Sequence, residues 1–408
     1  MRIILPDDVK TIVSRLISNG YEAYAVGGCV RDSIIRREPG DWDVTTSARP
    51  EEVKRIFGRT IDTGIRHGTV TVMLHGAGYE VTTYRLDGDY GDGRHPDSVE
   101  FTKSLTEDLK RRDFTINAMA YNDGDGLVDE FGGREDLRAG IIRCVGNPSE
   151  RFGEDALRML RAIRFSAQLG FEIESGTADA IRELAPAIAK VSRERIHTEF
   201  GKILLSPHPE YMGKLCEYGL SRYTLPELDG LSERETALEL VRRVPQKLFF
   251  RYAALLYGLG ADGVRSALKS LKLDNRTAEG AARLSGLHGM EPVCGEAQVR
   301  RLASGCGADC FSDALEFEAR YYEVTGQSAL AEAVERERAV FKTVTDRGDC
   351  LDIKALAIDG AALMGCGVAP GRDVGRLLRE GLELVLEDPG LNTRERLLER
   401  LGLKPLDA

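Results

Sequence analysis

The spacing of apolar positions changes near residue 145 of the chain. Before it, short runs rich in β-branched and aromatic residues lie between clusters of glycine and aspartate; they read YEAYAVGG, DWDVTT, GTVTVML, YEVTTYRL and VEFT. Alternating apolar and polar residues over runs of this length predict strands with one buried face. We therefore expect residues 1–146 to form a domain built on a mixed β-sheet.

Beyond residue 146 the strand signals vanish and apolar residues recur at helical spacing. The clearest segments are EDALRMLRAIRFSAQLG, RERIHTEFGKILL, PQKLFFRYAALLYGL, DALEFEARYYEV and GRLLREGLELVLE. Residues three or four positions apart share one face of a helix, so each segment predicts an amphipathic helix. The expected fold class is α+β, a mixed sheet domain followed by an all-α remainder.

Length and composition are those of a water-soluble protein with several domains. The chain has 408 residues, of which 42% are hydrophobic and 30% charged, and one hydrophobic core rarely serves so long a chain. No apolar run approaches the roughly 20 residues that span a bilayer. The start, MRIILPDDVK, becomes acidic before a signal peptide could form. We expect a cytoplasmic protein with no membrane contact.

The net charge limits how the chain could bind nucleic acid. With 56 basic and 66 acidic residues, the charge is −10, which argues against nonspecific binding of polyanions. RNA would have to be held by local basic patches, although such clusters are often only solvated faces. The candidate clusters are Lys190, Arg193 and Arg195; Arg242, Arg243, Lys247 and Arg251; and Lys269, Lys272 and Arg276.

Neither cysteines nor histidines indicate a site of their own. The eight cysteines are scattered and do not have the spacing of a disulfide framework. Cys306 and Cys310 have no second Cys or His pair nearby, as a zinc site would need. The six histidines are dispersed, and we assign them no catalytic role.

The segment REPGDWDVTT carries a pair of carboxylates. Asp41 and Asp43 lie two residues apart on an expected strand, so both point to one face and Trp42 to the other. Two neighbouring carboxylates repel each other unless a cation lies between them, which makes the pair a candidate Mg²⁺ site. Taken alone, the pair fits a solvated strand edge better. Glu80, on the later strand YEVTTYR, is the candidate third carboxylate, with an exposed strand glutamate as the alternative.

A phosphate-binding turn precedes the carboxylates. In YAVGGCVRDSIIRREPG a β-run is followed by Gly27 and Gly28 and then by a short helical pattern, which we expect to stop at Pro39 and Gly40. Glycines let a ligand approach the backbone, and a helix N-terminus presents free N–H groups. Arg31, in the first turn, adds a forked cation suited to phosphate. The order of these parts favours a nucleotide-binding site over an edge strand.

Five motifs occur in a fixed order through the first half of the chain. They are GGCVRD through DWD, RRDFTINAMA (Arg111–Ala120), VDEFGGREDL (ending at Leu137), EDALR (Glu154–Arg158) and RERIHTEFGKIL (Arg193–Leu204). This set resembles class II CCA-adding enzymes (tRNA nucleotidyltransferases) and bacterial poly(A) polymerases of the polymerase β superfamily. One departure is that the family often has glycine near Arg36, where this chain reads IIRRE.

The resemblance implies four domains and a reaction. It implies a nucleotidyltransferase head at 1–146, a helical neck for base recognition at 147–206, a body at 207–300 and a tRNA-binding tail at 301–408. The implied reaction is template-independent addition of CCA to the tRNA 3′ end from CTP and ATP. Two Mg²⁺ ions bound by Asp41 and Asp43 would assist attack of the 3′-OH on the α-phosphate, supported by Glu80. The implied partner is the acceptor and TΨC half of tRNA, with no obligate protein partner.

The fourth motif suggests how C and A could be selected. On a helix, Asp155 and Arg158 would be neighbours, and the resemblance assigns them to the base. Cytosine and adenine both present an amino donor beside a ring-nitrogen acceptor, which a carboxylate and a guanidinium match. Uracil and guanine present the reverse pattern. The alternative is an ordinary surface ion pair. Arg161 and Arg164, beside an apolar stripe on the same helix, would also face the nucleotide.

In the second motif, the resemblance implies that Arg112, Asp113 and Asn117 hold the ribose and triphosphate; alternatively, Asp113 caps a helix beginning at Phe114.

The segment LDGDYGDGRHPDSVEF, residues 86–101, is expected to be a mobile loop. In CCA-adding enzymes a loop at this place is needed for the switch from C to A addition, and CC-only relatives lack it.

The alternatives to CCA addition as the function of this chain are a poly(A) polymerase, an enzyme that adds part of CCA, a non-catalytic RNA-binding protein and an antibiotic-modifying nucleotidyltransferase.

Overall fold

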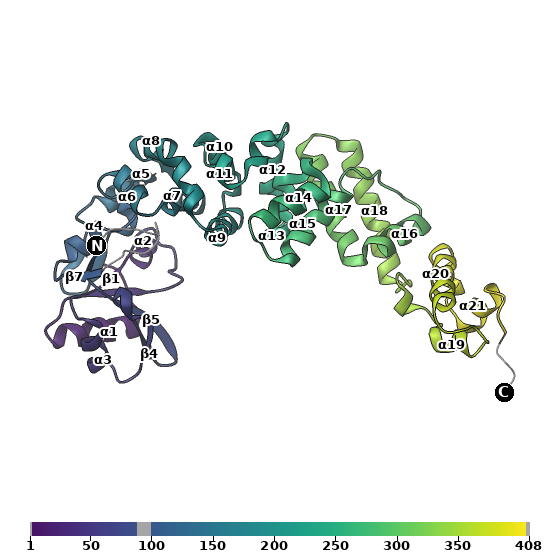
Figure 1. Ribbon diagram of the computed structural model, residues 1–408, viewed down its shortest axis with the longest axis horizontal. Helices are drawn as coiled ribbons and strands as arrows, with labels where there is room; N and C mark the ends of the chain where they lie inside the picture. The colour runs from purple at the N-terminus through teal and green to yellow at the C-terminus, as the bar shows by residue number, and fades with distance from the viewer. Residues whose placement is uncertain (1, 88–98, 405–408) are drawn as a thin grey trace. The chain divides into compact units, whose positions relative to one another are not determined.

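The computed structural model describes residues 2–87 and 99–404, and the chain divides into two compact units (Figure 1). Unit 1 is Met1–Gly230 together with Ser270–Leu273, and unit 2 is Leu231–Lys269 with Asp274–Ala408. The predicted order, a mixed sheet followed by helices, is confirmed.

Unit 1 is built on a seven-stranded sheet with the order β3-β4-β5-β2-β1-β8-β9. Its strands are β1 (Ala23–Val26), β2 (Asp43–Thr46), β3 (Thr60–Gly64), β4 (Thr69–Leu74), β5 (Ala77–Thr83), β8 (Ala120–Asn122) and β9 (Gly126–Val128). Strands β2 and β5 run parallel, and the other neighbours are antiparallel. Two small pairs stand apart: β6 (Arg85–Asp87) with β7 (Val99–Phe101), and β10 (Ile141–Ile142) with β11 (Glu172–Ile173).

The two faces of this sheet are covered differently. Helices α1 (Asp7–Ser18) and α3 (Pro50–Ile56) pack against one face. In α1 the buried residues Val9, Ile12, Val13 and Leu16 recur at helical spacing, so its apolar stripe meets the sheet. Side chains on the opposite face belong to a second cluster: Tyr24, Val26, Tyr84, Leu109, Ala118, Ala120 and Val145. The candidate site lies on this second face.

The remaining helices of unit 1 are α2 (Gly28–Ile34), α4 (Leu105–Lys110), α5 (Gly133–Ala139), α6 (Pro148–Glu154), α7 (Leu157–Leu169), α8 (Ser175–Leu184), α9 (Arg193–Leu204), α10 (Lys214–Glu217) and α11 (Ser221–Thr224). Short 3-10 turns are η1 (Ile65–His67), η2 (Thr115–Asn117), η3 (Ala185–Lys190), η4 (Pro209–Gly213) and η5 (Pro226–Gly230).

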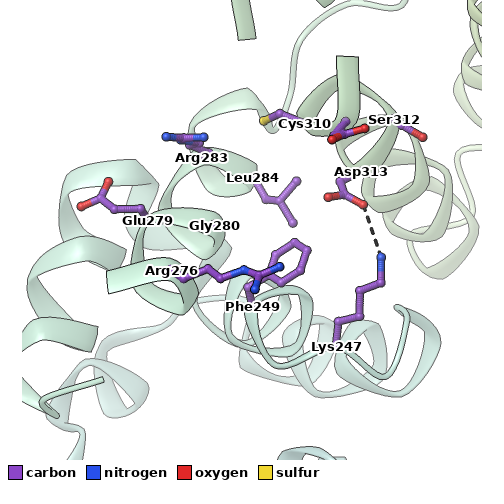
Figure 2. Close-up of a pocket in the computed structure, with 11 residues that line it drawn as sticks. Lys247, Phe249, Arg276, Glu279, Gly280, Arg283, Leu284, Cys310, Ser312 and Asp313 are labelled. Atoms are coloured by element: carbon purple, nitrogen blue, oxygen red, sulfur yellow. Dashed lines mark ion pairs between the residues drawn. The ribbon is translucent and has the colours of Figure 1, made fainter. Parts of the chain in front are cut away.

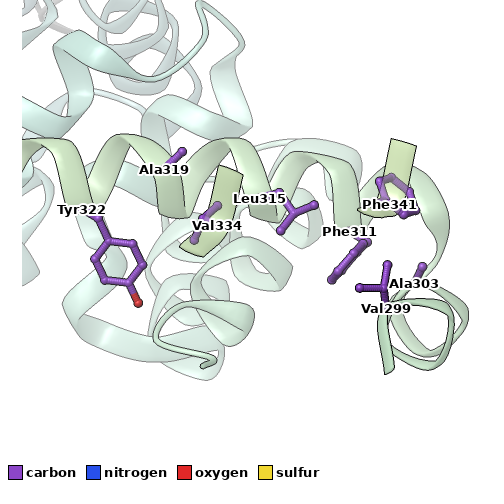
Figure 3. Close-up of a cluster of buried hydrophobic side chains, with 8 residues drawn as sticks. All are labelled: Val299, Ala303, Phe311, Leu315, Ala319, Tyr322, Val334 and Phe341. Atoms are coloured by element: carbon purple, nitrogen blue, oxygen red, sulfur yellow. The ribbon is translucent and has the colours of Figure 1, made fainter. Parts of the chain in front are cut away.

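The described part of unit 2 is helical throughout. Its helices are α12 (Arg234–Arg243), α13 (Leu248–Leu256), α14 (Gly260–Ser270), α15 (Asn275–Leu287), α16 (Glu296–Cys306), α17 (Ala308–Val324), α18 (Ser328–Asp346), α19 (Gly360–Met364), α20 (Arg372–Glu387) and α21 (Arg394–Arg400). Three 3-10 turns, η6 (Tyr257–Leu259), η7 (Ile353–Ala355) and η8 (Pro389–Leu391), connect them. Figure 3 shows the core between α16, α17 and α18, where Phe311 packs edge-on against Phe341 at 5.0 Å.

Several expectations about the elements were wrong in detail. Strands β3, β8 and β9 carried no clear signal, and β11 lies beyond residue 145, where no strand was expected. β11 is two residues long and exists because it pairs with β10, a contact that local spacing does not encode. The run YEVTTYRL is interrupted at Tyr84 and forms both β5 and β6. The expected mobile loop falls mostly on residues 88–98, outside the described residues.

Among the helices of residues 2–87 and 99–404, none combines the length and apolar character that crossing a lipid bilayer requires.

Candidate active site

Two of the three predicted carboxylates are adjacent across the parallel strands β2 and β5. Val44 pairs with Val81 in register, so Asp43 and Glu80, each one residue earlier, are also neighbours. Because side chains alternate along a strand, both point away from the face of the two buried valines. Asp41 is not on the strand as expected, since β2 begins at Asp43. It lies in the exposed segment that leads into the strand.

The three carboxylates nevertheless share one electrostatic environment. Burial, together with the negative charges of Asp41 and Glu80, raises the pKa of Asp43 to about 6, while Arg112 opposes the shift. In the described part of the chain, no three His, Cys, Asp or Glu side chains converge closely enough to form a complete metal site. The donor chemistry still fits a hard divalent cation, because carboxylate oxygens that repel one another are stabilised by one.

The turn before the carboxylates has the conformation that glycine favours. Gly27 has φ of +83° and lies directly before α2, and a Cβ added there would be 2.9 Å from Nη1 of Arg112. Helix α2 ends at Ile34, earlier than the expected stop at Pro39. Arg36 has φ of +60°, a left-handed conformation that costs most residues about 1 kcal/mol. A glycine at this position would avoid that cost, whereas this chain adopts the same conformation with arginine.

A chain of hydrogen bonds joins four of the predicted residues. Arg31 Nη1 donates to Asn117 Oδ1 at 2.7 Å, and Asn117 Nδ2 donates to Asp113 Oδ1 at 3.2 Å. Arg161 then donates to Asp113 Oδ2 from Nε at 2.8 Å and Nη2 at 2.5 Å. Burial opposes the ionisation of Asp113, but Arg161 and Asn117 outweigh it and hold the pKa below its usual range. The network joins α2 and η2 to α7.

Asp113 fills the alternative role of a helix cap only in part. Asp113 Oδ1 accepts the backbone N–H of Phe114 at 2.9 Å. No α-helix begins there, because Phe114 is extended and forms an isolated bridge with Cys144. Only the 3-10 turn η2 follows. Asp113 therefore acts mainly as the partner of Arg161.

The expected helical pair of Asp155 and Arg158 was wrong in its geometry. Helix α6 ends at Glu154 and Asp155 is extended, so Asp155 precedes α7 rather than lying within it, and its carbonyl oxygen accepts from the N–H of Arg158 at 3.0 Å. Asp155 Oδ1 accepts the N–H of Leu157 at 3.0 Å, which caps the start of α7, and its Oδ2 accepts from Arg195 Nη2 at 2.7 Å. Arg158 is paired with Glu154 at 2.5 Å. Each therefore has another partner in this structure.

Tertiary structure nevertheless brings Asp155 and Arg158 to one cavity of about 290 Å³. Five arginines, two aspartates and a leucine line it: Arg111, Arg112, Asp113, Asp155, Leu157, Arg158, Arg161 and Arg195. Sequence reasoning missed Arg111, although it stands beside Arg112 in the same motif. Arg195 was expected only as an RNA contact. Buried Asp108 was also missed; it accepts from Arg111 Nη2 at 2.7 Å and thereby positions that guanidinium.

Arg164 is not among the residues that line this cavity. It is buried, forms an ion pair with Glu199 at 2.7 Å, and lies over the ring of Phe165 at 4.1 Å. Arg164 was expected to face the nucleotide, but in this structure its anionic and aromatic partners are internal.

The basic clusters are also partly internal. Arg251 is buried and donates to the backbone carbonyl oxygens of Val241 and Pro245, so it was wrong to place it at an RNA contact. Arg193 donates to the carbonyl oxygens of Tyr223 and Thr224 at 3.1 and 3.0 Å. A cation already held by backbone carbonyls contributes little to a phosphate contact.

Comparison with known proteins places this architecture. A model of the poly(A) polymerase head domain matches residues 23–143, and one described as "Probable RNA and SrmB-binding site of polymerase A" matches residues 170–231. The CCA-adding enzyme of Limosilactobacillus fermentum is 38% identical over 413 residues, covering 97% of this chain and 96% of that protein. The Geobacillus stearothermophilus enzyme is 46% identical over 276 residues, with 67% and 68% covered.

A solved structure agrees along the whole chain. The crystal structure of the Bacillus stearothermophilus CCA-adding enzyme in complex with CTP superposes with a TM-score of 0.77 and 33% identity, covering 98% of each chain. With the carboxylates, the glycine turn and the arginine-lined cavity in the order described, the chain belongs to the family of CCA-adding enzymes.

Proposed function

We propose that this chain completes the 3′ end of tRNA by adding two cytidines and one adenosine from CTP and ATP, without a nucleic-acid template. The observation that carries the proposal is the register of β2 on β5, which places Asp43 beside Glu80, with Asp41 and Arg112 close enough to act on the charge of Asp43. Phosphoryl transfer needs such a carboxylate cluster beside cations that receive a triphosphate.

The proposed step is an in-line displacement at phosphorus. The RNA 3′-OH attacks the α-phosphate; an O–P bond forms, the bond to the bridging oxygen breaks, and pyrophosphate leaves. Asp41 and Asp43 would hold Mg²⁺, which supplies positive charge that lowers the pKa of the hydroxyl and neutralises the triphosphate. Glu80 adds negative potential beside them and so strengthens cation binding.

The arginine-lined cavity would receive the incoming nucleotide. Gly27 and Gly28 let the phosphates approach the backbone at the start of α2, and Arg112 lies directly beside Gly27. Asp113 would orient Arg161 toward the nucleotide, because two of its donors are already fixed on that carboxylate. Arg31 and Asn117 would act through the same network. Preorganised donors of this kind stabilise developing charge without reorganising.

Base selection would follow from a change of partners at the cavity. Asp155 would leave Arg195 to accept from the amino group of C or A, and Arg158 would leave Glu154 to donate to the ring nitrogen. With U or G, the Asp155 carboxylate would meet a base carbonyl and the Arg158 guanidinium would meet a ring N–H. Neither pair can form a hydrogen bond, at a cost of a few kcal/mol. Arg164 would support this wall of the cavity from beneath, through Phe165.

The domain assignment remains part of the proposal. The head at 1–146 would hold the carboxylates and the neck at 147–206 would read the base. The body at 207–300 and the tail at 301–408 would bind the acceptor and TΨC half of tRNA. A cytoplasmic location belongs to the same proposal, because tRNA and nucleoside triphosphates occur together there.

An incorporation assay tests the function. A labelled tRNA transcript ending at its discriminator base is incubated with Mg²⁺ and CTP, ATP, both, UTP or GTP, and its length is read on a sequencing gel. Two added residues with CTP and three with both nucleotides are expected. A long tail with ATP alone would indicate a poly(A) polymerase. Addition that stops after two residues with both nucleotides present would indicate an enzyme that adds only part of CCA. RNA binding with no extension under any condition would leave a non-catalytic RNA-binding protein.

A further inference from the structure

Unit 2 contains a second, larger cavity that the proposed chemistry does not use. It has a volume of about 610 Å³ and lies among α13, α15 and α17 (Figure 2). This size is within the range of sites that hold a small ligand or a nucleotide. Phe249 lies at its centre, with Arg276 and Arg283 on one side and Lys247 and Asp313 on the other.

One face of α15 shapes the aromatic part of this cavity. Arg276, Gly280 and Arg283 are spaced four and three residues apart, so they lie on the same side of the helix. A Cβ added at Gly280 would be 3.2 Å from both Cβ and Cγ of Phe249. The glycine therefore lets the partly exposed ring of Phe249 lie against the helix backbone.

Some of the charged residues around the ring have ion-pair partners and others have none. Glu279 accepts from Arg265 and is within 3.9 Å of Lys269, and Asp313 is 3.8 Å from Lys247. Arg276 and Arg283 are exposed, and no ion pair within the described residues of unit 2 engages either one.

Asp309, at the start of α17, is the remaining carboxylate of the cavity wall. Two available guanidinium groups and one available carboxylate therefore line the cavity together with the aromatic ring. The surplus of positive charge comes from α15, which carries both arginines.

We propose that this cavity binds one unpaired nucleotide of an RNA, whose base stacks on Phe249 while the flanking phosphates contact Arg276 and Arg283. A ring that accepts the flat face of any base, beside forked cations that pair with phosphate, is the combination that recognises single-stranded RNA. Lys247, whose Nζ lies over the ring at 5.9 Å from its centroid, adds further positive charge. The inference rests on the proposed function to the extent that it takes RNA as the substrate.

The test measures RNA affinity without any nucleotide addition. Binding of a fluorescein-labelled tRNA transcript lacking CCA is followed by anisotropy, without nucleoside triphosphates, at several salt concentrations. For Arg276→Gln/Arg283→Gln we expect Kd to rise about tenfold and the slope of log Kd against log salt to fall by about 1.5, since two phosphate contacts are lost. For Phe249→Leu we expect a rise of at least about fivefold, and for Phe249→Trp nearly unchanged affinity, because stacking needs only an aromatic ring.

The matched control removes the same charges elsewhere. Arg15, on α1, and Arg59, just after α3, are exposed and have no ion pair within the described residues of unit 1, and they line neither this cavity nor the arginine-lined cavity of the candidate active site. Arg15→Gln/Arg59→Gln should leave Kd within about twofold. Equal losses in the two double variants, or wild-type affinity in Phe249→Leu, would overturn the proposal.

A spectroscopic measurement separates stacking from charge loss and RNA from free nucleotide. Trp42 is the only native tryptophan, so the difference between Phe249→Trp and wild-type emission reports on position 249. Quenching by the tRNA transcript is expected, and ATP alone at millimolar concentration should not quench. Quenching by ATP but not by RNA would identify a free-nucleotide site and overturn the proposal. If the wild type binds RNA through this cavity but extends nothing, the proposed function fails and this inference stands.

Discussion

Arg161 donates two hydrogen bonds to a single oxygen of Asp113, from Nε at 2.8 Å and from Nη2 at 2.5 Å. Asp113 is buried, whereas Arg161 lines the cavity that we assign to the incoming nucleotide. The guanidinium is therefore held in place before any ligand arrives. A buried carboxylate with a depressed pKa is what fixes it.

Arg161→Gln should lower the free energy of unfolding by about 2–4 kcal/mol at pH 7.5, because it leaves the carboxylate of Asp113 buried without its main counter-charge. In the wild type this pair stabilises the fold above pH 4 and loses its effect as pH falls through the depressed pKa. In the variant, protonation relieves the cost, so the deficit should shrink toward pH 5. Urea unfolding at both pH values measures this. Arg379→Gln, an exposed arginine, is the control; a deficit independent of pH would contradict the explanation.

Asp41→Asn and Asp43→Asn should each reduce nucleotide incorporation by at least about a thousandfold, since each removes half of the proposed cation site. Kd for tRNA should stay within about twofold. In EDTA at pH 8, Asp43→Asn should be at least as stable as wild type, because burial and the charges of Asp41 and Glu80 disfavour the ionised carboxyl. Incorporation assays, anisotropy and thermal unfolding are the measurements. Retained incorporation in either variant would remove that residue from the proposed site.

Gly27→Ala should raise the KM for both CTP and ATP by about tenfold. The added Cβ would come within 2.9 Å of Nη1 of Arg112 and displace a cation next to the phosphate turn. Gly20→Ala is a matched control, since Gly20 has nearly the same backbone φ, +86°, but no atom within 4 Å of the added Cβ. Both variants carry the strain of a left-handed alanine, about 1 kcal/mol. Equal KM values in the two variants would show that Arg112 is not involved.

Asp155→Asn and Arg158→Gln should each narrow the preference for CTP over UTP by about tenfold to a hundredfold, the effect of mispairing one buried polar group. Asparagine and glutamine can each present either a donor or an acceptor. Glu154→Gln is the control, because it weakens the resting ion pair of Arg158 without changing either base-reading group. Competition assays with mixed nucleotides give the ratio. If Glu154→Gln relaxes selection as much as the other two, direct base reading is wrong.

Glu337, in α18, should make the stability of unit 2 depend on pH. Burial raises the pKa of this carboxyl to about 7, opposed only by a hydrogen bond from the backbone of Val293. The folded state thus holds a proton that the unfolded state releases between about pH 4.5 and 7. Stability should fall as pH rises through that window, by at most roughly 3 kcal/mol. Glu337→Gln should abolish this dependence and be the more stable protein at pH 8 in denaturant titrations. A parallel pH profile in the variant would rule Glu337 out as the cause.

The sequence by itself determined the kinds of element and their order. The helical repeat in RERIHTEFGKILL predicted α9 almost to the residue, because the apolar stripe of a helix depends only on the spacing of nearby residues. The glycine turn and the carboxylate pair were identified in the same way, from residue types at short spacing, whereas Arg112 was identified from the resemblance of its motif to a known family. Strand β11 and the break at Asp155 were not, because a two-residue strand and an extended residue between helices depend on distant partners.

Only the tertiary structure decided which charges face a ligand. Arg161 and Arg164 are three residues apart on one helix, yet Arg161 lines the cavity, whereas Arg164 forms an ion pair with Glu199 and lies over the ring of Phe165. The register of β2 on β5 likewise set Glu80 beside Asp43, a contact across 37 residues. The physical reason is that burial and pairing of a charge depend on whatever the fold places around it, whereas helical and strand periodicity depend only on neighbours in the chain.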